Sequence, residues 1–596
     1  MFRQNPNLIY RTRFPQRITE SRLALSPQPL VGGTGSATLL GSLGEASVLV
    51  DFDREIVGGL ELSLTVSAPT HVRIDYEEEA ELAKRREPLA CTWFTLVTDE
   101  YDIEAGDHVL VSQGRRGFRF VNISVTSEQD VKINRIKAID GTWNFTEKGS
   151  FRCSDDRLNR IWDISAATTK ACMQDFYEDG VKRDGLLWLG DYRITFLCAY
   201  YLTGDFALAK KCLRMMRDSQ YEFGAIPACA ARGGGEQHHR DDGISYMPRI
   251  PGDGQNRWVI LNYMCDYIKG IEEYVRMTGD DAILPEMMES AEKAMDYLVG
   301  LTDLETPGKW YIDDYKAKRD ENGMNFTILT DCTMNPKNCF ESYGAFLFEM
   351  LIAADALIRL ADITGNTALS KRITALKARL DEHIETHYKE PTHGQYTDRK
   401  RQKFVDISQY VTPQVILAGK EEEIGMERMM RSVMPALGFS QAWRLEAMFK
   451  KGYVTEALRD IRSAWGKMLD HDSRTCWERL DLPEMNATHY YDATGSLCHG
   501  WGASPAWQLP AWITGIQPTS DGFRTVTVAP QLDTLDWAEA TVPTPHGELF
   551  VRAERKGKKE LITVLIPNGV EKCTVKFSNG SEMTFTSAGR YSVSSI

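Results

Sequence analysis

Residues 200–209 read Tyr-Tyr-Leu-Thr-Gly-Asp-Phe-Ala-Leu-Ala, two apolar helical stretches separated by a Thr-Gly-Asp turn. Glycine suits the left-handed backbone conformation of the residue that ends a helix, and aspartate or asparagine can cap the start of the next helix. Similar turns recur as Thr278-Gly279-Asp280 and Thr364-Gly365-Asn366, at intervals of 75 residues (203 to 278) and 86 residues (278 to 364). Because these intervals are too irregular for a solenoid, the pattern favours a closed ring of helical hairpins with a loop-lined cavity at one end.

On either side of this region the hydrophobic period falls to two. Residues 60–66 and 72–76 alternate apolar with polar side chains, as half-buried strands do. The same alternation returns after Gly515, at residues 526–528 and 562–564. A β-sandwich is the simplest packing for many short strands, so both ends of the chain are expected to be β-domains.

These changes of period divide the chain into three domains. We expect an N-terminal β-sandwich over residues 1–148, a helical domain over 149–516 and a C-terminal β-sandwich over 517–596. A scaffolding role is favoured for both β-domains, with a separate carbohydrate-binding role as the alternative.

Composition restricts the class of protein. The chain has 596 residues, of which 42% are hydrophobic and 26% charged, as in ordinary globular proteins of several domains. Its net charge of −14, without a long basic cluster, argues against nucleic acid or an anionic membrane as a partner. The oligomeric state stays open, a homo-oligomer included.

Cysteine usage and the N-terminal sequence bear on location. The twelve cysteines are scattered singly, with neither Cys-x-x-Cys pairs nor Cys/His spacings typical of metal sites. The first residues lack an apolar signal core, and no 18-residue apolar run occurs. These features favour a cytoplasmic enzyme.

Residues 179–191 read Asp-Gly-Val-Lys-Arg-Asp-Gly-Leu-Leu-Trp-Leu-Gly-Asp and contain the densest group of chemically useful side chains. The carboxylates of Asp179, Asp184 and Asp191 do not share a helical face, and three glycines argue against a helix. A loop that turns carboxylates and the Trp188 indole into one cavity suits sugar chemistry, because acids bind hydroxyls or transfer protons and an indole stacks on a pyranose. A surface loop with local ion pairs explains the composition equally well.

Two further segments carry candidate residues. Thr475-Cys476-Trp477-Glu478 places Glu478 beside an indole, where apolar neighbours can tune a carboxyl group for catalysis; a plain ion-pair partner is the alternative. In the segment over residues 496–501, His499 could bind substrate hydroxyls or be a satisfied core histidine. Other expected cavity residues at loop–helix junctions are Asp253, Trp258, Asp313, Asp314 and Trp443.

The glycine-rich loop over residues 232–242 does not indicate a metal or phosphate site. His238 and His239 are adjacent and would point in different directions, and the loop lacks the strand and lysine context of a phosphate loop. We expect it at the rim of the cavity.

Taken together, these segments resemble a known family. The domain order and the motifs look like those of the bacterial and fungal α-L-rhamnosidases, inverting enzymes of glycoside hydrolase family 78. The resemblance runs from Ser150 to about Gly589 and more weakly through the first β-domain. It implies an (α/α)6 barrel between β-sandwich domains and rests on residues 183–191, 475–478, 496–499 and 541–547.

The resemblance also implies roles for single residues. Asp184 falls where the general acid stands, and Glu478 falls where the general base stands. In an inverting enzyme these carboxyl groups lie about 6.5–9.5 Å apart, with a water between base and sugar. No metal or organic cofactor is implied, and the implied substrate-binding residues are Asp179, Arg183, Trp188, Asp191, Trp443 and His499.

Asp184 departs from the family pattern, in which the general acid is usually Glu, and Gly185 follows it where many members carry Arg. The proton donor and the sugar specificity therefore stay open. The alternatives are another helical-barrel glycosidase, a glycoside phosphorylase, or a catalytically silent carbohydrate-binding protein.

Overall fold

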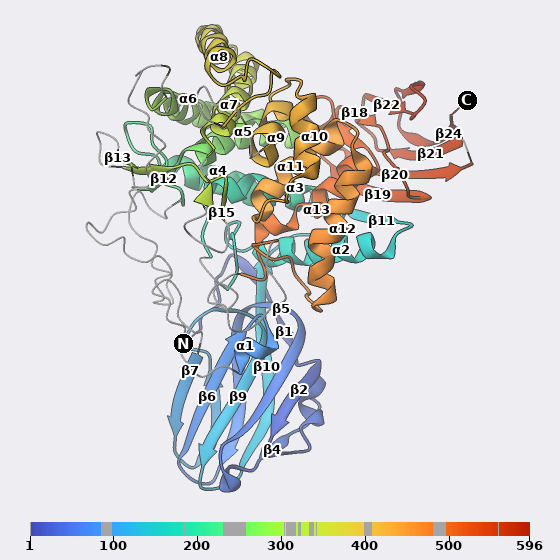
Figure 1. Cartoon of the computed structure of the whole chain (residues 1–596). Helices are drawn as coiled ribbons and strands as arrows, with labels where there is room; N and C mark the ends of the chain where they lie inside the picture. The colour runs from blue at the N-terminus through green and yellow to red at the C-terminus, as the bar shows by residue number, and fades with distance from the viewer. Residues whose placement is uncertain are drawn as a thin grey trace.

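The computed structural model describes residues 2–84, 98–182, 185–230, 258–302, 304, 318–319, 324–332, 339–340, 342–398, 408–480, 496–557 and 559–595. Several predicted site positions lie outside these residues: Arg183, Asp184, Asp253, Asp313, Asp314 and the loop over 232–242. Figure 1 shows a β-domain at the N-terminal end, a helical body beside it, and a second group of strands against the helices near the C-terminus.

The N-terminal β-domain is built around one long strand. Its strands are β1 (Leu8–Arg13), β2 (Arg17–Arg22), β3 (Ala24–Leu25), β4 (Ala37–Leu39), β5 (Ala46–Val66), β6 (Thr70–Glu77), β7 (Thr98–Ile103), β8 (Gly106–Val111), β9 (Arg116–Ser127) and β10 (Val131–Trp143), with a short helix α1 (Ala80–Ala83). The first half of β5 pairs with β2 and β9, and its second half with β8 and β10. The alternation predicted for residues 60–66 is confirmed, because Leu60, Leu62, Leu64 and Val66 are buried in this domain's own core.

The helical body begins after β11 (Ser150–Cys153). Its helices are α2 (Asp156–Cys172), α3 (Leu189–Thr203), α4 (Ala207–Asp218), α5 (Leu261–Thr278), α6 (Leu284–Gly300), α7 (Tyr343–Ile363), α8 (Thr367–His387), α9 (Ser408–Leu417), α10 (Glu423–Arg431), α11 (Gly438–Lys450), α12 (Val454–Asp470) and α13 (Pro505–Gln508). Short strands lie in its loops: β12 (Trp258–Ile260), β13 (Lys318–Arg319), β14 (Asn325–Thr327), β15 (Asp331–Cys332) and β16 (Cys339–Phe340). Contacts join α3 to α5, α5 to α7, α7 to α9, α9 to α11, and α11 back to α3.

The predicted hairpin turns are confirmed. Gly204 and Gly279 end α3 and α5 in the left-handed conformation, at φ of 67° and 71°. Gly365 follows α7 at φ of 70°, and the Asn366 side chain then caps α8 by accepting from the Leu369 amide at 3.1 Å. Each turn satisfies backbone groups that the helix ends leave unpaired.

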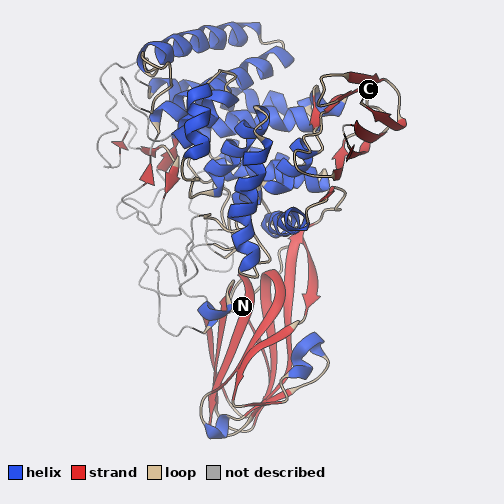
Figure 2. Cartoon of the chain, turned by 45° about the vertical axis from the view of Figure 1, so that its right-hand side comes forward, coloured by secondary structure: helices blue, strands red, loops and turns tan. Residues whose placement is uncertain are grey.

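The C-terminal strands form two sheets, visible at the side of the helices in Figure 2. The first has the order β11-β19-β20-β21-β24 and the second β17-β18-β22-β23. Residues 150–153, which the sequence places at the start of the helical domain, therefore pair as β11 with β19 near the other end of the chain. The bounds are β17 (Ile516–Pro518), β18 (Thr525–Val528), β19 (Trp537–Thr544), β20 (Gly547–Lys556), β21 (Lys559–Ile566), β22 (Lys572–Lys576), β23 (Glu582–Phe585) and β24 (Gly589–Ser594).

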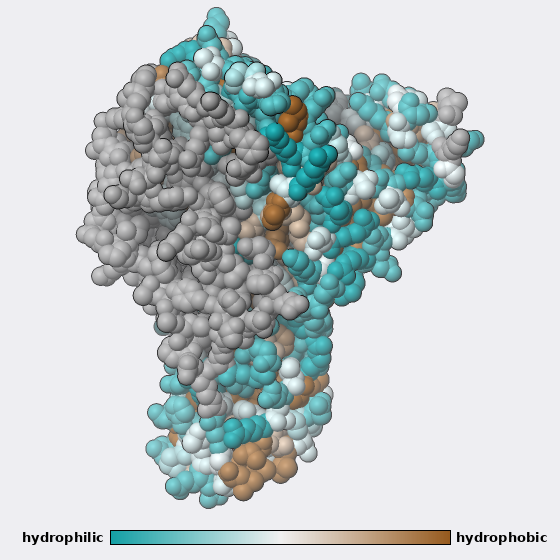
Figure 3. Space-filling model, viewed as in Figure 1, coloured by the Kyte–Doolittle hydropathy of each residue, from teal (hydrophilic) through white to brown (hydrophobic). Residues whose placement is uncertain are grey.

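The described surface is mainly hydrophilic on the face shown in Figure 3, with a hydrophobic area near the tip of the N-terminal β-domain. Among the described residues, no helix is long and apolar enough to span a bilayer.

Gly149 joins the N-terminal β-domain to the helical body and provides a test of this fold. Its amide donates to Leu202 O at 2.8 Å, and an added Cβ would lie 1.9 Å from Tyr201 O. We expect Gly149→Ala to destabilise the protein by about 1–3 kcal/mol or more, because the neighbour is rigid backbone. Gly300→Ala, in open space at the end of α6, should instead be neutral or stabilising by at most about 1 kcal/mol. Urea unfolding compares the two, and equal midpoints would contradict this account of the junction.

Candidate active site

The candidate site forms where two distant segments run side by side. Gly180 pairs with His499 as an antiparallel bridge, the Gly500 amide donates to Asp179 O at 2.6 Å, and the Val181 amide donates to Cys498 O at 3.4 Å. An added Cβ on Gly180 would lie 2.8 Å from Ser496 Oγ. The missing side chain of Gly180 therefore permits the close approach of the two segments.

Asp179 closes the carboxylate-containing loop at its N-terminal end. Its carboxylate Oδ1 accepts from the Leu186 amide at 2.9 Å, and its own amide donates to Leu186 O at 3.0 Å. Gly185 supplies the left-handed φ of 60° that the returning chain needs. Asp179 is thus tied to the base of a loop whose centre, Arg183 and Asp184, lies outside the described residues.

His499 and Asp191 form a buried pair. His499 Nε2 lies 3.2 Å from Asp191 Oδ1, and both residues are at most 3% exposed. Asp191 stands in the first turn of α3, where the helix dipole favours a carboxylate. The other ring nitrogen of His499, Nδ1, is buried and has no hydrogen-bond partner among the described residues, so it differs from a satisfied core histidine.

Glu478 is held by backbone groups. The Glu478 amide donates to Ser496 O at 3.0 Å, and the Ser496 amide donates back to the Glu478 carboxylate Oε2 at 3.2 Å. The Trp501 indole donates to Glu478 O at 2.8 Å, and the Trp501 ring lies 4.4 Å from that of His499. Trp501 therefore connects the backbone of Glu478 to the His499–Asp191 pair, and the catalytic roles of these residues stay a prediction.

The two predicted tryptophans occupy different positions. Trp188 is half-buried at the N-terminus of α3, meets the Trp258 ring edge-on at 5.7 Å, and its Nε1 has no partner among the described residues. Trp443 is only 2% exposed and packs against Phe439, which in turn contacts Trp501. Trp443 thus lies behind the rings nearest to His499, and its proposed contact with a sugar remains a prediction.

A buried charge network that the sequence motifs did not predict lies next to Trp443. Arg193 of α3 donates to both carboxylate oxygens of Glu273 at 2.8 Å and to Asp266 Oδ1 at 3.0 Å. The Arg193 guanidinium also lies 4.1 Å from the Trp443 ring centre. The signal was available: Arg193 is the one basic residue of α3, and every residue of that helix is buried.

This network alters the protonation of Asp266. Burial raises the pKa of Asp266 to about 7, against the opposing charge of Arg193, and the Asp191 carboxylate adds to the rise. The pKa of Glu273 is lowered despite its burial, because Arg193 binds both of its oxygens. The cation therefore holds Glu273 as its ionised partner, while Asp266 can take up a proton near neutral pH. Burial also raises the pKa values of Glu349 and Glu446, whose carboxyl groups interact with Arg193.

The helical body and its flanking sheets define a multidomain protein of the α and β class whose candidate site is built from buried carboxylates. The chain belongs to the bacterial alpha-L-rhamnosidase six-hairpin glycosidase family: residues 146–513 match the family model of that domain. Residues 515–590 match the bacterial alpha-L-rhamnosidase C-terminal domain. The resemblance predicted from the sequence motifs is thereby confirmed.

Individual relatives are more distant. An alpha-L-rhamnosidase of Alteromonas sp. (strain LOR) is 22% identical over 579 residues, which covers 91% of this chain and 57% of the relative. One of Formosa agariphila is 20% identical and covers 76% of this chain and 46% of the relative. The chain thus spans about half the length of the curated relatives it matches.

Solved structures show the same fold. The family 78 rhamnosidase of Bacillus sp. GL1 superposes with a TM-score of 0.69 at 26% identity, covering 86% of this chain and 51% of that one. A rhamnosidase of Klebsiella oxytoca, solved with rhamnose bound, gives 0.66 at 18% identity and covers 85% of this chain and 96% of that one.

The raised pKa of Asp266 predicts a specific pH dependence of stability. Between about pH 4, the ordinary value in an unfolded chain, and pH 7, the native state keeps a proton that the unfolded state releases. The stabilisation is therefore complete at low pH and is lost as pH rises, by at most about 1.4 kcal/mol per pH unit. Asp266→Asn cannot titrate at this position. The Tm of the variant minus the Tm of wild type should therefore increase as pH rises from about 4 to 7. The exposed control Asp362→Asn should keep a constant offset; a constant offset for Asp266→Asn as well would refute the assignment.

Proposed function

We propose that this chain is an α-L-rhamnosidase that releases terminal rhamnose from a glycoside by an inverting, two-carboxylate mechanism. The observation that carries the proposal is the arrangement of Glu478 and His499–Asp191 within the span that matches the six-hairpin glycosidase domain. The rhamnose bound to the Klebsiella oxytoca relative supports the choice of sugar.

Glu478 is the proposed general base. Its carboxylate oxygen Oε2 accepts a hydrogen bond from the Ser496 amide, which fixes the orientation of the carboxylate. A fixed carboxylate is suited to take a proton from water. Asp184 is the proposed general acid and protonates the departing oxygen. A separation of about 6.5–9.5 Å between the two carboxyl groups would admit the attacking water.

The proposed sugar contacts use the surrounding polar and aromatic groups. His499 Nδ1, buried and without a described partner, can bind a hydroxyl, and Asp191 fixes the ring through Nε2. Asp179 and Arg183 are proposed to bind further hydroxyls. Trp188 and Trp443 are proposed as the apolar wall for the C5 methyl of rhamnose.

We also propose the finer fold: an (α/α)6 barrel over residues 149–516 between β-sandwich domains over 1–148 and 517–596. The successive contacts among α3, α5, α7, α9 and α11 support a barrel, because they return to α3.

The proposed setting is the cytoplasm, with a glycoside as the partner and neither nucleic acid nor membrane. The nine cysteines whose side chains are described are free and buried, as expected of a reducing compartment. The proposed mechanism uses only protein carboxylates, and a homo-oligomer is compatible with it.

Glu478→Gln tests the base. We expect hydrolysis of aryl α-L-rhamnosides to fall by at least about 10²–10⁴-fold, because the amide cannot accept the proton from water, while calorimetry still detects rhamnose binding. Glu382→Gln, exposed on α8, is the matched control and should keep full activity. Turnover near wild type in Glu478→Gln would remove this residue from the mechanism.

The anomeric outcome tests the two-carboxylate geometry. Proton NMR of the first sugar released should show the β-anomer of rhamnose, because water attacks from the face opposite the leaving group. A first product that retains the α-configuration would exclude the inverting mechanism, and turnover that requires phosphate would point to a phosphorylase.

A further inference from the structure

We propose that the N-terminal β-domain takes part in catalysis by fixing the two loops of the candidate active site relative to each other, with Glu78 as the positioning residue. This proposal rests on the glycosidase function proposed above. The contacts that carry it, the interdomain clamp, join Glu77, Glu78 and Arg115 of the β-domain to Glu178, Lys182 and Leu497 of the helical body.

The first arm of the clamp holds the segment over residues 178–182 through a buried cation. Lys182 Nζ lies 2.9 Å from Glu77 Oε2 and 3.3 Å from Glu78 Oε2, and all three side chains are at most 7% exposed. A buried ammonium group is stable only when it is paired, so this segment depends on carboxylates of the β-domain. Lys182 precedes the proposed acid, Asp184, by two residues.

The second arm holds the segment that orients the proposed base. The same oxygen, Glu78 Oε2, accepts from the Leu497 amide at 2.7 Å. The preceding amide, that of Ser496, donates to Glu478 Oε2 at 3.2 Å. One dipeptide, Ser496–Leu497, is therefore bound by the β-domain through its second amide and orients Glu478 through its first.

Further contacts join the β-domain to the segment over residues 178–182. Arg115 forms an ion pair with Glu178 and also donates to Val181 O at 3.4 Å. Gly117, in β9, lies so close to the loop that an added Cβ would be 2.6 Å from the Val181 carbonyl carbon. The β-domain is therefore in direct backbone contact with the loop.

The charge on Glu78 depends on the clamp itself. Burial raises the pKa of Glu78, and the Lys182 ammonium and the Leu497 amide counteract the rise. Losing either partner would therefore weaken the other contact, because a neutral carboxyl group is the poorer acceptor.

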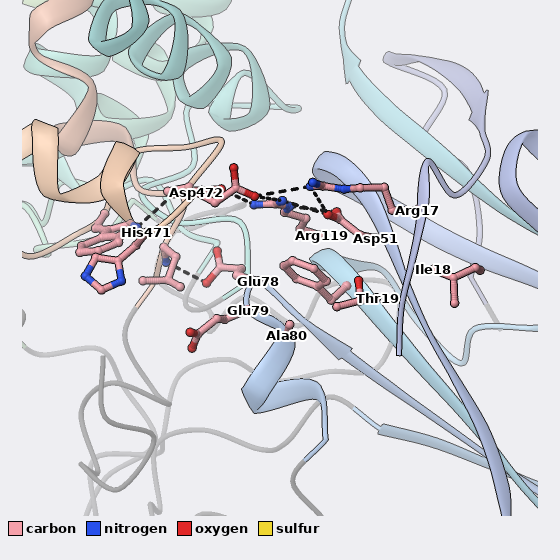
Figure 4. A pocket seen from close by; sticks show the side chains of 14 residues that line it. Arg17, Ile18, Thr19, Asp51, Glu78, Glu79, Ala80, Arg119, His471 and Asp472 are labelled. Carbon is pink, nitrogen blue, oxygen red and sulfur yellow. Dashed lines mark hydrogen bonds and ion pairs between the residues drawn. The ribbon is translucent and has the colours of Figure 1, made fainter. Parts of the chain in front are cut away.

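A second interdomain contact lies beside the clamp but touches neither loop (Figure 4). Arg119 of β9 lies 3.0 Å from Asp472 Oδ2, next to a cavity of about 350 Å³ that Glu78 also lines. Asp472 has a left-handed φ of 55°, which asparagine tolerates. Asp472→Asn thus weakens the same domain interface without altering the clamp.

The clamp has a kinetic consequence because an inverting enzyme needs its acid and base at a fixed separation. A misplacement of roughly 1 Å can cost about 10² in rate. Of the proposed sugar-binding residues, Asp191 of α3 and Trp443 of α11 lie outside the two clamped segments, so the loss should fall on kcat more than on affinity.

The experiment compares Glu78→Met, which removes both contacts at similar volume, with Glu78→Gln, which keeps one acceptor oxygen. We expect kcat on aryl α-L-rhamnosides to fall by about 10²-fold in Glu78→Met and by about tenfold in Glu78→Gln, with a smaller loss of rhamnose affinity. Lys182→Met combined with Glu78→Met should lose less than the product of the single losses, because both act through one clamp. Asp472→Asn should lower Tm but leave kcat unchanged.

Hydrogen exchange keeps the test independent of activity. The Leu497 amide should exchange faster in Glu78→Met than in Asp472→Asn, even if the chain acts on another glycoside or on none. If the wild type is inactive on rhamnosides but this exchange difference is present, the proposed function is refuted and the clamp is not. Wild-type kcat in Glu78→Met, an equal loss of kcat in Asp472→Asn, or unchanged exchange would each overturn the clamp.

Discussion

The site depends on one backbone contact, the antiparallel pairing of Gly180 with His499. A side chain at position 180 would lie 2.8 Å from Ser496 Oγ, so glycine at residue 180 lets the two segments meet without displacing Ser496. Once they meet, Asp179 is fixed by the Gly500 amide, and His499 reaches Asp191 at the start of α3. The carboxylates of the site are thus arranged by main-chain geometry, which is stiffer than side-chain contacts would be.

Buried charge adds a second constraint. Arg193 and Lys182 are both buried, and each forms ion pairs with two acidic side chains. Removing one partner of such a group leaves an uncompensated charge, which typically costs about 3–5 kcal/mol. The two groups have different positions: Arg193 lies within the helical body beneath Asp191, whereas Lys182 joins that body to the N-terminal β-domain. The active-site loop is consequently anchored from two domains.

These anchors change the interpretation of the N-terminal β-domain. Scaffolding was the favoured role from sequence, and its independent core of alternating side chains agrees with that role. The proposed clamp gives this scaffold a specific role in the active site. Glu78 contacts both Lys182, two residues before the proposed acid, and the peptide that orients the proposed base. A domain can act as a scaffold and still set catalytic geometry.

The sequence by itself determined the features that depend on near neighbours. The Thr-Gly-Asp turns, the alternation in β5 and the motifs around Glu478 and His499 could be recognised because a turn, a strand or a family motif occupies a few consecutive residues. Only the tertiary structure decided which distant residues meet: β11 joins a sheet formed near the other end of the chain, Trp443 lies behind Phe439, and Arg193 finds Asp266 and Glu273. The Glu78–Leu497 contact spans 419 positions. Such pairings follow from the packing of whole elements, whose relative placement no local pattern encodes.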